Sequence, residues 1–147
     1  MGKDGSFEDW GALVRWATLR HTLVDQKESG FAVVWRFALE GEAPRRQRVE
    51  VKRRHGHDEE WIELLARVEL GASFSARMAL DTSGELVAGT LVLDDGDYAI
   101  RSVLPRCVTR DAFEQALELI AFEAASLPLS IAEPPTLSLG FLAEMYA

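Results

Sequence analysis

The amino-acid sequence predicts an α+β fold, in which helices pack on a mostly antiparallel sheet. Two observations lead to this prediction. Residues 86 to 104 form two β-rich runs joined by the turn Asp94-Asp95-Gly96-Asp97, and Asp-Gly between such runs is a strong signal for a β-hairpin. Residues 110 to 127 then place apolar side chains at helical spacing, which predicts a helix lying against a sheet.

The first element along the chain is expected to be a helix. Ser6 and Asp9 are three residues apart, as in a capping box, so the helix is expected to begin here and to reach about His21. The residues that recur at helical spacing are Phe7, Trp10, Leu13, Val14 and Ala17. Trp16 and Leu19 lie outside this stripe, so they either widen the core face or face a partner. The polar stretch from Asp25 to Gly30 is expected to end the helix.

Three strands are expected next. Residues 31 to 39 alternate aromatic and β-branched residues with others, which predicts a half-buried strand. Val49 and Val51 alternate with charged neighbours in a second strand, and residues 61 to 70 form a third. Because the intervening turns are short, these strands are expected to form an antiparallel meander.

The second half of the chain adds two helices and the hairpin. Residues 72 to 80 are expected to form a short helix, since Phe74 and Met78 are four residues apart and alanines favour helix. Residues 81 to 84 are turn-like and lead back to the hairpin. The predicted order is therefore helix, three strands, short helix, two strands and long helix, or α-βββ-α-ββ-α.

The long helix has clear expected ends. Thr109 is the expected N-cap, Asp111 places a carboxylate in the first turn, and Pro128 is expected to end the helix. Its apolar stripe is Phe113, Ala116, Leu117, Ile120, Ala121, Ala124 and Leu127. Residues 128 to 147 then form an apolar C-terminal tail, which is expected to pack on its own domain or on another chain. The residues expected to bind a partner there are Leu137, Leu139, Phe141 and Leu142.

Length and composition restrict the possible classes of protein. A chain of 147 residues that is 48% apolar has the size of a single domain, residues 1 to 147. A net charge of −8 argues against binding to nucleic acid or to anionic membranes. Cys107 is the single cysteine, so no intramolecular disulfide forms. The sequence shows no secretory signal peptide and no apolar run of the roughly 18 residues that a membrane span needs, so a cytoplasmic protein is expected.

The element order resembles that of the type III secretion chaperone-like family, which includes the class I effector chaperones and the YbjN-like proteins. The resemblance covers residues 6 to 127. It depends on the acidic-turn hairpin Leu86 to Pro105, which ends in Leu-Pro, and on the amphipathic helix that follows at residues 112 to 127. It implies a non-enzymatic, usually homodimeric protein, whose chaperone members hold an extended segment of a client against apolar patches on helix and sheet. A basic hairpin and the apolar tail distinguish this chain, and no functional residue is transferred from the family.

Two polar clusters have both a functional and a structural interpretation. His55 and His57 precede Asp58, Glu59 and Glu60, residue types that bind divalent metals, but such a turn is more often simply solvated. A basic stretch over residues 45 to 54 contains Arg45, Arg46, Arg48, Lys52, Arg53 and Arg54. This stretch either meets an acidic partner or a phosphate group, or protects an exposed edge hairpin against aggregation. The edge interpretation is favoured, since no aromatic residue within the stretch is there to stack on a base.

No catalytic constellation is apparent in the sequence. Cys107 precedes the long helix beside Arg106, where a thiolate is favoured, but no base can be assigned to it, and His21 lies far away along the chain. The sequence contains no G-x-S-x-G, P-loop or H-E-x-x-H motif. We therefore expect a protein that is not an enzyme, with no catalytic residues, no cofactor and no metal site. The four tryptophans, Trp10, Trp16, Trp35 and Trp61, are expected mainly in the core, with at least two partly exposed if a partner surface exists.

Two functions are the main hypotheses, and an enzyme that uses Cys107 is a third. The first is a chaperone- or adaptor-like protein-interaction domain, a homodimer by its resemblance, that binds another protein through apolar surface on helix and sheet. The alternative is a small regulatory domain that binds a nucleotide or other anionic ligand through the basic hairpin 45 to 54.

Overall fold

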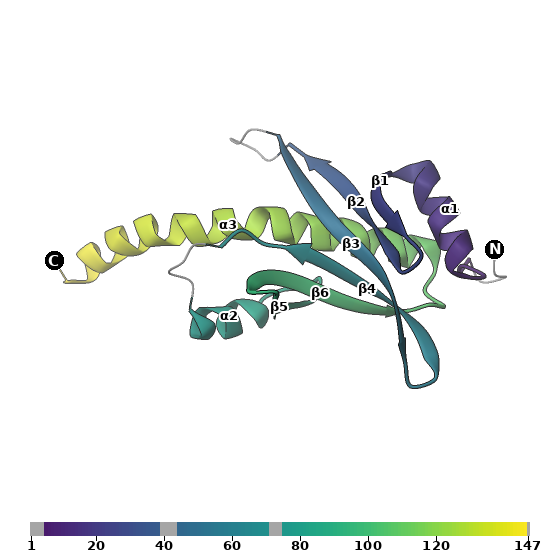
Figure 1. Cartoon of the computed structure of the whole chain (residues 1–147). Coiled ribbons are helices and arrows are strands. Elements are labelled where there is room, and N and C mark those ends of the chain that lie inside the picture. Colours follow the sequence, from purple (N-terminus) through teal and green to yellow (C-terminus); the bar gives the residue numbers. More distant parts are fainter. Residues whose placement is uncertain (1–4, 39–43, 71–74, 147) are drawn as a thin grey trace.

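The computed structural model describes residues 5–38, 44–70 and 75–146. These residues form α1 (Trp10–Arg20), β1 (Thr22–Lys27), β2 (Gly30–Phe37), β3 (Arg45–Gly56), β4 (Glu59–Arg67), α2 (Ala76–Ser83), β5 (Thr90–Asp94), β6 (Asp97–Pro105) and α3 (Arg110–Tyr146). The strands make one antiparallel sheet in the order β1-β2-β3-β4-β6-β5. Helix α3 crosses one face of this sheet and continues beyond it (Figure 1). The predicted α+β class is confirmed, and the predicted element order fits with one strand added.

Helix α1 begins later than the sequence suggested. Its N-cap is Asp9, whose Oδ1 accepts a hydrogen bond from the Ala12 N–H at 2.8 Å. Ser6 instead forms an isolated β-bridge with Thr109, so the predicted capping box at Ser6 is wrong. The side chains of Trp10, Leu13 and Ala17 are buried, as the helical spacing predicted.

Strand β1 is the added element. It covers the polar stretch after α1 and pairs with β2 from Thr22↔Val34 to Lys27↔Gly30. Its side chains are exposed or half-buried, because it is an edge strand of the sheet. Backbone pairing therefore holds β1 in place without the apolar alternation by which strands are recognised in a sequence.

Strands β2, β3 and β4 form the predicted meander and line the core. Val33, Val49, Val51, Ile62 and Leu64 are fully buried on the face that α3 covers. Strand β4 ends at Arg67 rather than at residue 70. The sheet therefore buries one face under the helices and leaves the alternate residues of each strand on the other.

Helix α2 begins and ends later in the chain than the sequence predicted. Ser75 caps it, since Ser75 Oγ accepts a hydrogen bond from the Met78 N–H at 3.2 Å. The helix therefore begins at Ala76 and includes residues 81 to 83, which the sequence suggested as a turn. Residues 72 to 74 of the expected helix lie outside the described residues.

The hairpin of β5 and β6 forms as predicted. Asp94 pairs with Asp97, and the two residues between them have positive φ angles of 51° at Asp95 and 83° at Gly96. Positive φ at both central positions is the geometry of a two-residue type I′ turn, which matches the twist of the flanking strands. Local sequence alone therefore specifies this hairpin.

Helix α3 begins as predicted but does not end where predicted. Thr109 Oγ1 accepts a hydrogen bond from the Ala112 N–H at 3.2 Å, and the expected stripe from Phe113 to Leu127 is buried except for Ala116, which is half-buried. Pro128 does not end the helix, which extends to Tyr146, so the expected boundary there is wrong. Proline removes one helical hydrogen bond, but the helical φ angle suits it. Arg45 Nη1 also donates to the Ala125 carbonyl at 2.7 Å, one turn before the proline.

Candidate functional site

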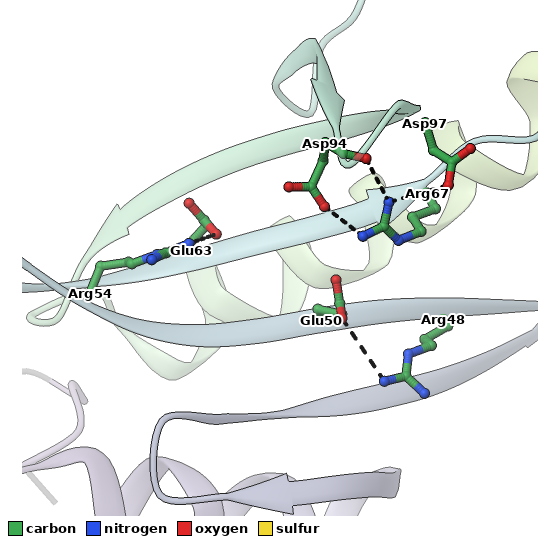
Figure 2. A network of polar contacts seen from close by, with 7 residues as sticks. All are labelled: Arg48, Glu50, Arg54, Glu63, Arg67, Asp94 and Asp97. Carbon is green, nitrogen blue, oxygen red and sulfur yellow. Dashed lines mark hydrogen bonds and ion pairs between the residues drawn. The ribbon is translucent and has the colours of Figure 1, made fainter.

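The face of the sheet turned away from α3, here called the open face, holds the most extensive polar network of the described residues. On β3, Val49 and Val51 point toward the core, so the alternate residues Arg48, Lys52 and Arg54 lie on the open face. Figure 2 shows this face, with its ion-paired side chains in front of the strands and a helix behind them. Water hydrates these charged side chains, so this face of the sheet does not require a covering helix.

Glu63 of β4 lies at the centre of the network and is held by two arginines. Arg54 Nη2 donates to Glu63 Oε1 at 3.1 Å, and Arg101 Nε donates to Glu63 Oε2 at 2.7 Å. The Glu63 side chain is only 5% exposed, whereas those of Arg54 and Arg101 are 55% and 45% exposed. One buried carboxylate thus fixes two guanidinium groups at the surface, and this shared partner reduces their conformational freedom.

The ionisation of Glu63 follows from these contacts. Burial alone raises the pKa of the carboxyl group, because it penalises the charged form. The hydrogen bonds from Arg101 and Arg54, together with their positive charges, outweigh burial and lower the pKa below the ordinary value for glutamate. Glu63 is therefore a carboxylate at neutral pH, and the cluster of Arg54, Glu63 and Arg101 has one net positive charge.

A depression of about 650 Å³ lies over this cluster and extends across β3, β4, β6 and β5. Besides the charged cluster, its lining includes the apolar side chains of Trp61, Leu65, Val92 and Val103, and His55 and His57 of the β3–β4 turn. The indole of Trp61 is fixed in place, since its Nε1–H donates to the Gly56 carbonyl at 2.9 Å. The depression thus combines guanidinium donors with an aromatic and aliphatic wall, which suits the binding of an anion that has an apolar body.

A second ion-pair group lies beside the depression. Arg67 Nη2 donates to Asp94 Oδ2 at 2.5 Å, Arg67 Nη1 donates to the Asp94 carbonyl at 3.1 Å, and Asp97 Oδ2 is 3.8 Å from Arg67 Nη1. Figure 2 shows Arg67 between these two aspartates of the β5–β6 turn. Arg67 thus pairs with Asp94 at the rim of the depression, and the group of one arginine and two aspartates carries one net negative charge.

The basic stretch from Arg45 to Arg54 lies on β3, which is an inner strand of the sheet between β2 and β4. The favoured interpretation of this stretch as an exposed edge hairpin is therefore wrong, because position in the sheet depends on strand order and not on local sequence. Among the described residues, four of its six basic side chains have partners: Arg45 with the Ala125 carbonyl, Arg48 with Asp25 at 2.6 Å, Arg53 with Glu60 at 2.7 Å, and Arg54 with Glu63.

The other polar residues singled out in the sequence do not come together as one site. His55 and His57 lie at the β3–β4 turn, where Glu60 binds Arg53, and no group of three or more metal-ligating side chains occurs in the part of the chain that the structure describes. Cys107 is exposed in the turn before α3. His21 Nε2 lies 2.8 Å from Glu114 Oε2, so this histidine links the end of α1 to α3.

The tryptophans divide between core and surface. Trp10 is buried, and Trp16, Trp35 and Trp61 are half-buried. Trp16 widens the core, since its ring lies 5.4 Å from that of Phe7 and 5.7 Å from that of Phe113. Leu19, the other residue outside the α1 stripe, is 87% exposed. Of these aromatic residues, Trp61 is the one that lines the open-face depression.

The residues expected to bind a partner are in the C-terminal half of α3. Leu137, Leu139, Phe141 and Leu142 lie within the helix Arg110–Tyr146, in the portion that extends beyond the sheet in Figure 1. Their side chains lie outside the described part of the structure. They were expected in a separate tail, and the structure instead makes them a continuation of the core helix.

Glu63 and Arg101 are the functional candidates that sequence reasoning missed. Each is a charged residue in the middle of a strand and follows a buried isoleucine, Ile62 before Glu63 and Ile100 before Arg101. That signal is weak alone, because a charged residue at an alternate position normally faces water. The two residues are 38 positions apart, and only the pairing of β4 with β6 brings them together.

Of the helices in the described residues, none has the length and apolar character needed to cross a membrane. Comparisons of the chain with protein-family models, with curated proteins and with solved structures found no match.

Proposed function

We propose that this chain is a non-enzymatic protein-interaction domain of the chaperone or adaptor kind, which works in the cytoplasm as a homodimer and binds another protein through apolar surface on helix α3. The observation that supports this most directly is an apolar pair on the exposed side of the helix. Leu119 and Phe122 are three residues apart and are 37% and 46% exposed. Large apolar side chains that remain exposed beside one another are typical of surfaces that bind other proteins.

The course of α3 extends this surface. The helix continues past the sheet, and its sequence there is apolar, with Leu137, Leu139, Phe141 and Leu142 within six residues (Figure 1). A helix that leaves its own sheet with such a sequence is well suited to pack on a second protein chain. The resemblance of the element order to secretion chaperone-like proteins supports the same proposal, including the homodimer.

The test compares the oligomeric state and the captured partner of several full-length variants. We expect the wild type to be a dimer by light scattering at tens of micromolar. We also expect it to retain one stoichiometric host protein after affinity capture and mass spectrometry. Two variants should lose the partner while circular dichroism shows an intact fold. One combines Leu119→Gln with Phe122→Gln, and the other combines Leu137→Gln, Leu139→Gln, Phe141→Gln and Leu142→Gln.

Leu19→Gln is the matched control, because Leu19 is exposed on α1 and not on α3. It should behave as the wild type. A monomeric wild type at this concentration would contradict the homodimer, and capture that returns only the bait would contradict the protein partner.

A second candidate function is a regulatory domain that binds a nucleotide or other anion through residues 45 to 54. One observation favours it: β3 places Arg46, Arg48 and Lys52 on the open face, with Arg46 directly opposite Arg36 of β2. Like charges at paired positions are unfavourable unless an anion lies between them. The test is calorimetric titration with ATP. Replacing Arg45, Arg46 and Arg48 with alanine should abolish binding without loss of folding, and unchanged binding would remove this candidate.

A further inference from the structure

The depression on the open face contains two guanidinium groups with unused donors. Arg54 uses Nη2 and Arg101 uses Nε to bind Glu63. Each guanidinium has five N–H donors, and no other group in the described residues accepts a hydrogen bond from either of them. Both side chains are about half exposed, so the remaining donors are open to a ligand.

The charge of the cluster of Arg54, Glu63 and Arg101 favours an anion. Glu63 neutralises one of the two arginines, so the cluster keeps one positive charge. Arg67 pairs with Asp94 at the rim and lies near Asp97, and these three residues together carry one negative charge. The positive charge of the cluster lies beside donors that the buried carboxylate has oriented in advance. Guanidinium donors in a fixed arrangement bind carboxylate and phosphate groups well, because these anions accept several such hydrogen bonds at once.

Part of the remaining wall is apolar, and His55 and His57 of the β3–β4 turn also line the depression. Trp61 presents a half-buried indole whose Nε1–H is already bonded to Gly56, so the ring contributes contact area rather than a polar group. Val92 and Val103 of the neighbouring strands line the same depression, and Val103 remains 40% exposed. A ligand that carries an apolar group next to its anionic group would pack this apolar group on the exposed valine and the fixed indole, while the arginines bind the anion.

We infer that the depression over Arg54, Glu63, Arg101 and Trp61 is a binding site for a small organic anion, in which a carboxylate or phosphate group is attached to an aromatic or other apolar body. The anionic group binds the free donors of Arg54 and Arg101, and the body packs on Trp61, Val92 and Val103. Glu63 positions both arginines. This site is independent of the α3 surface proposed above and is also distinct from Arg45, Arg46 and Arg48.

The test is an NMR titration of the ¹⁵N-labelled full chain with four probes. Phenyl phosphate and benzoate have both features of the inferred ligand, inorganic phosphate has only the charge, and phenol has only the ring. The signal of the Trp61 indole N–H, assigned by its loss in Trp61→Phe, should shift and saturate. At least one of the two complete probes should bind about tenfold or more tightly than both phosphate and phenol, as two charge-assisted hydrogen bonds and an apolar contact require.

Three variants locate the site. The first is a triple variant that combines Arg54→Met, Glu63→Met and Arg101→Met. It removes the cluster without leaving a buried charge unpaired, so the fold is expected to persist. Val103→Glu places a negative charge at an exposed position in the depression and leaves the cluster intact. Each should weaken binding of the complete probe by about tenfold or more, consistent with the loss or repulsion of a charged partner. Arg46→Gln with Arg48→Gln, on the same face outside the depression, should bind as the wild type.

Several outcomes would overturn the inference. Inorganic phosphate binding as tightly as both phenyl phosphate and benzoate would show that the apolar wall contributes nothing. Loss of binding in Arg46→Gln with Arg48→Gln would place the anion at the basic stretch instead. Unchanged binding in Val103→Glu, or no saturable shift of the Trp61 signal with any probe, would leave the cluster as an ion-pair network that only keeps the sheet face hydrated. None of these results depends on whether the α3 surface binds a protein.

Discussion

Residues far away in the sequence determine the ionisation of the Glu63 side chain. Its carboxylate is buried, yet the pKa is lowered because Arg101 and Arg54 together outweigh the cost of burial. A lowered pKa in the folded state means that Glu63 stabilises the fold above the pKa of an unfolded glutamate, about 4.3. This contribution is lost as the pH falls from there through the lower folded value.

We therefore expect Glu63→Gln to reduce the free energy of unfolding at pH 7 by about 1–2 kcal/mol, a range discounted because both arginines are half exposed. The difference from the wild type should shrink as the pH falls below the unfolded value of about 4.3, and should be lost only below the lower pKa of the folded carboxyl group. Urea unfolding followed by circular dichroism at several pH values measures both effects. Glu59→Gln, at the exposed start of β4, is the control and should show no comparable change. A pH-independent difference between Glu63→Gln and the wild type would contradict this account.

At the scale of the elements, α3 is where local rules and the observed structure differ most. A proline inside a helix removes one hydrogen bond and ordinarily costs about 3 kcal/mol, so a helix end was expected at Pro128. The helix instead passes through this position, next to the bond from Arg45 to the Ala125 carbonyl. Burial of residues 113 to 127 against the sheet fixes the preceding turns, which allows the following residues to continue the same helix.

Pro128→Ala tests this continuity. In a continuous helix, alanine restores a donor for the Ala124 carbonyl and should raise the free energy of unfolding by up to about 3 kcal/mol. The helical circular dichroism signal at about 222 nm should stay at the wild-type level or rise. Ser126→Ala, in the same turn but without a change in backbone donors, is the control. Unchanged stability in Pro128→Ala would indicate that the helix ends at the proline after all.

At the scale of the whole molecule, one core joins segments from both ends of the described chain. The Phe113 ring is fully buried and lies 5.8 Å from the ring of Phe7 and 5.7 Å from that of Trp16. It therefore ties α3 to the N-terminal segment and to α1. Glu114 adds a polar link to His21, and Glu123 Oε1 accepts hydrogen bonds from Val87 N–H and Ala88 N–H before β5.

Because these links converge on α3, we expect the sheet and helices to unfold together. Phe113→Ala should lower the free energy of unfolding by about 3–5 kcal/mol, as for other large core aromatics. The unfolding midpoint should fall equally when measured by circular dichroism and by the NMR signals of β1 and β5. Leu119→Ala on the exposed side of α3 is the matched control and should change stability by less than about 1 kcal/mol. Separate midpoints for β1 and β5 would show that the sheet is not one cooperative unit.

Some parts of the fold could be predicted because their causes are local. The Asp95-Gly96 turn has the positive φ angles that its residues favour, and Thr109 caps α3. The apolar spacing in α3 predicts which face of the helix is buried. Those signals depend only on residues within a few positions of one another. They were sufficient for the α+β class and for most of the element order.

The candidate site was much less accessible to prediction. The sequence drew attention to Arg54 as part of a basic stretch and to Trp61 as one of four tryptophans, but it did not join them to Glu63 and Arg101. Glu123 likewise accepts two backbone hydrogen bonds from a loop more than thirty residues away in the sequence. Such pairings depend on which strands become neighbours, and strand order is not a property of any short segment.

The sequence by itself determined the class of the fold, the β5–β6 hairpin and the inward face of α3, because periodicity and turn chemistry act over a few residues. Only the tertiary structure decided that β1 adds an edge strand, that the basic stretch lies inside the sheet and that α3 continues past Pro128. It also decided that Glu63 holds two arginines over an apolar depression, because the register of β3, β4 and β6 sets which charged side chains meet.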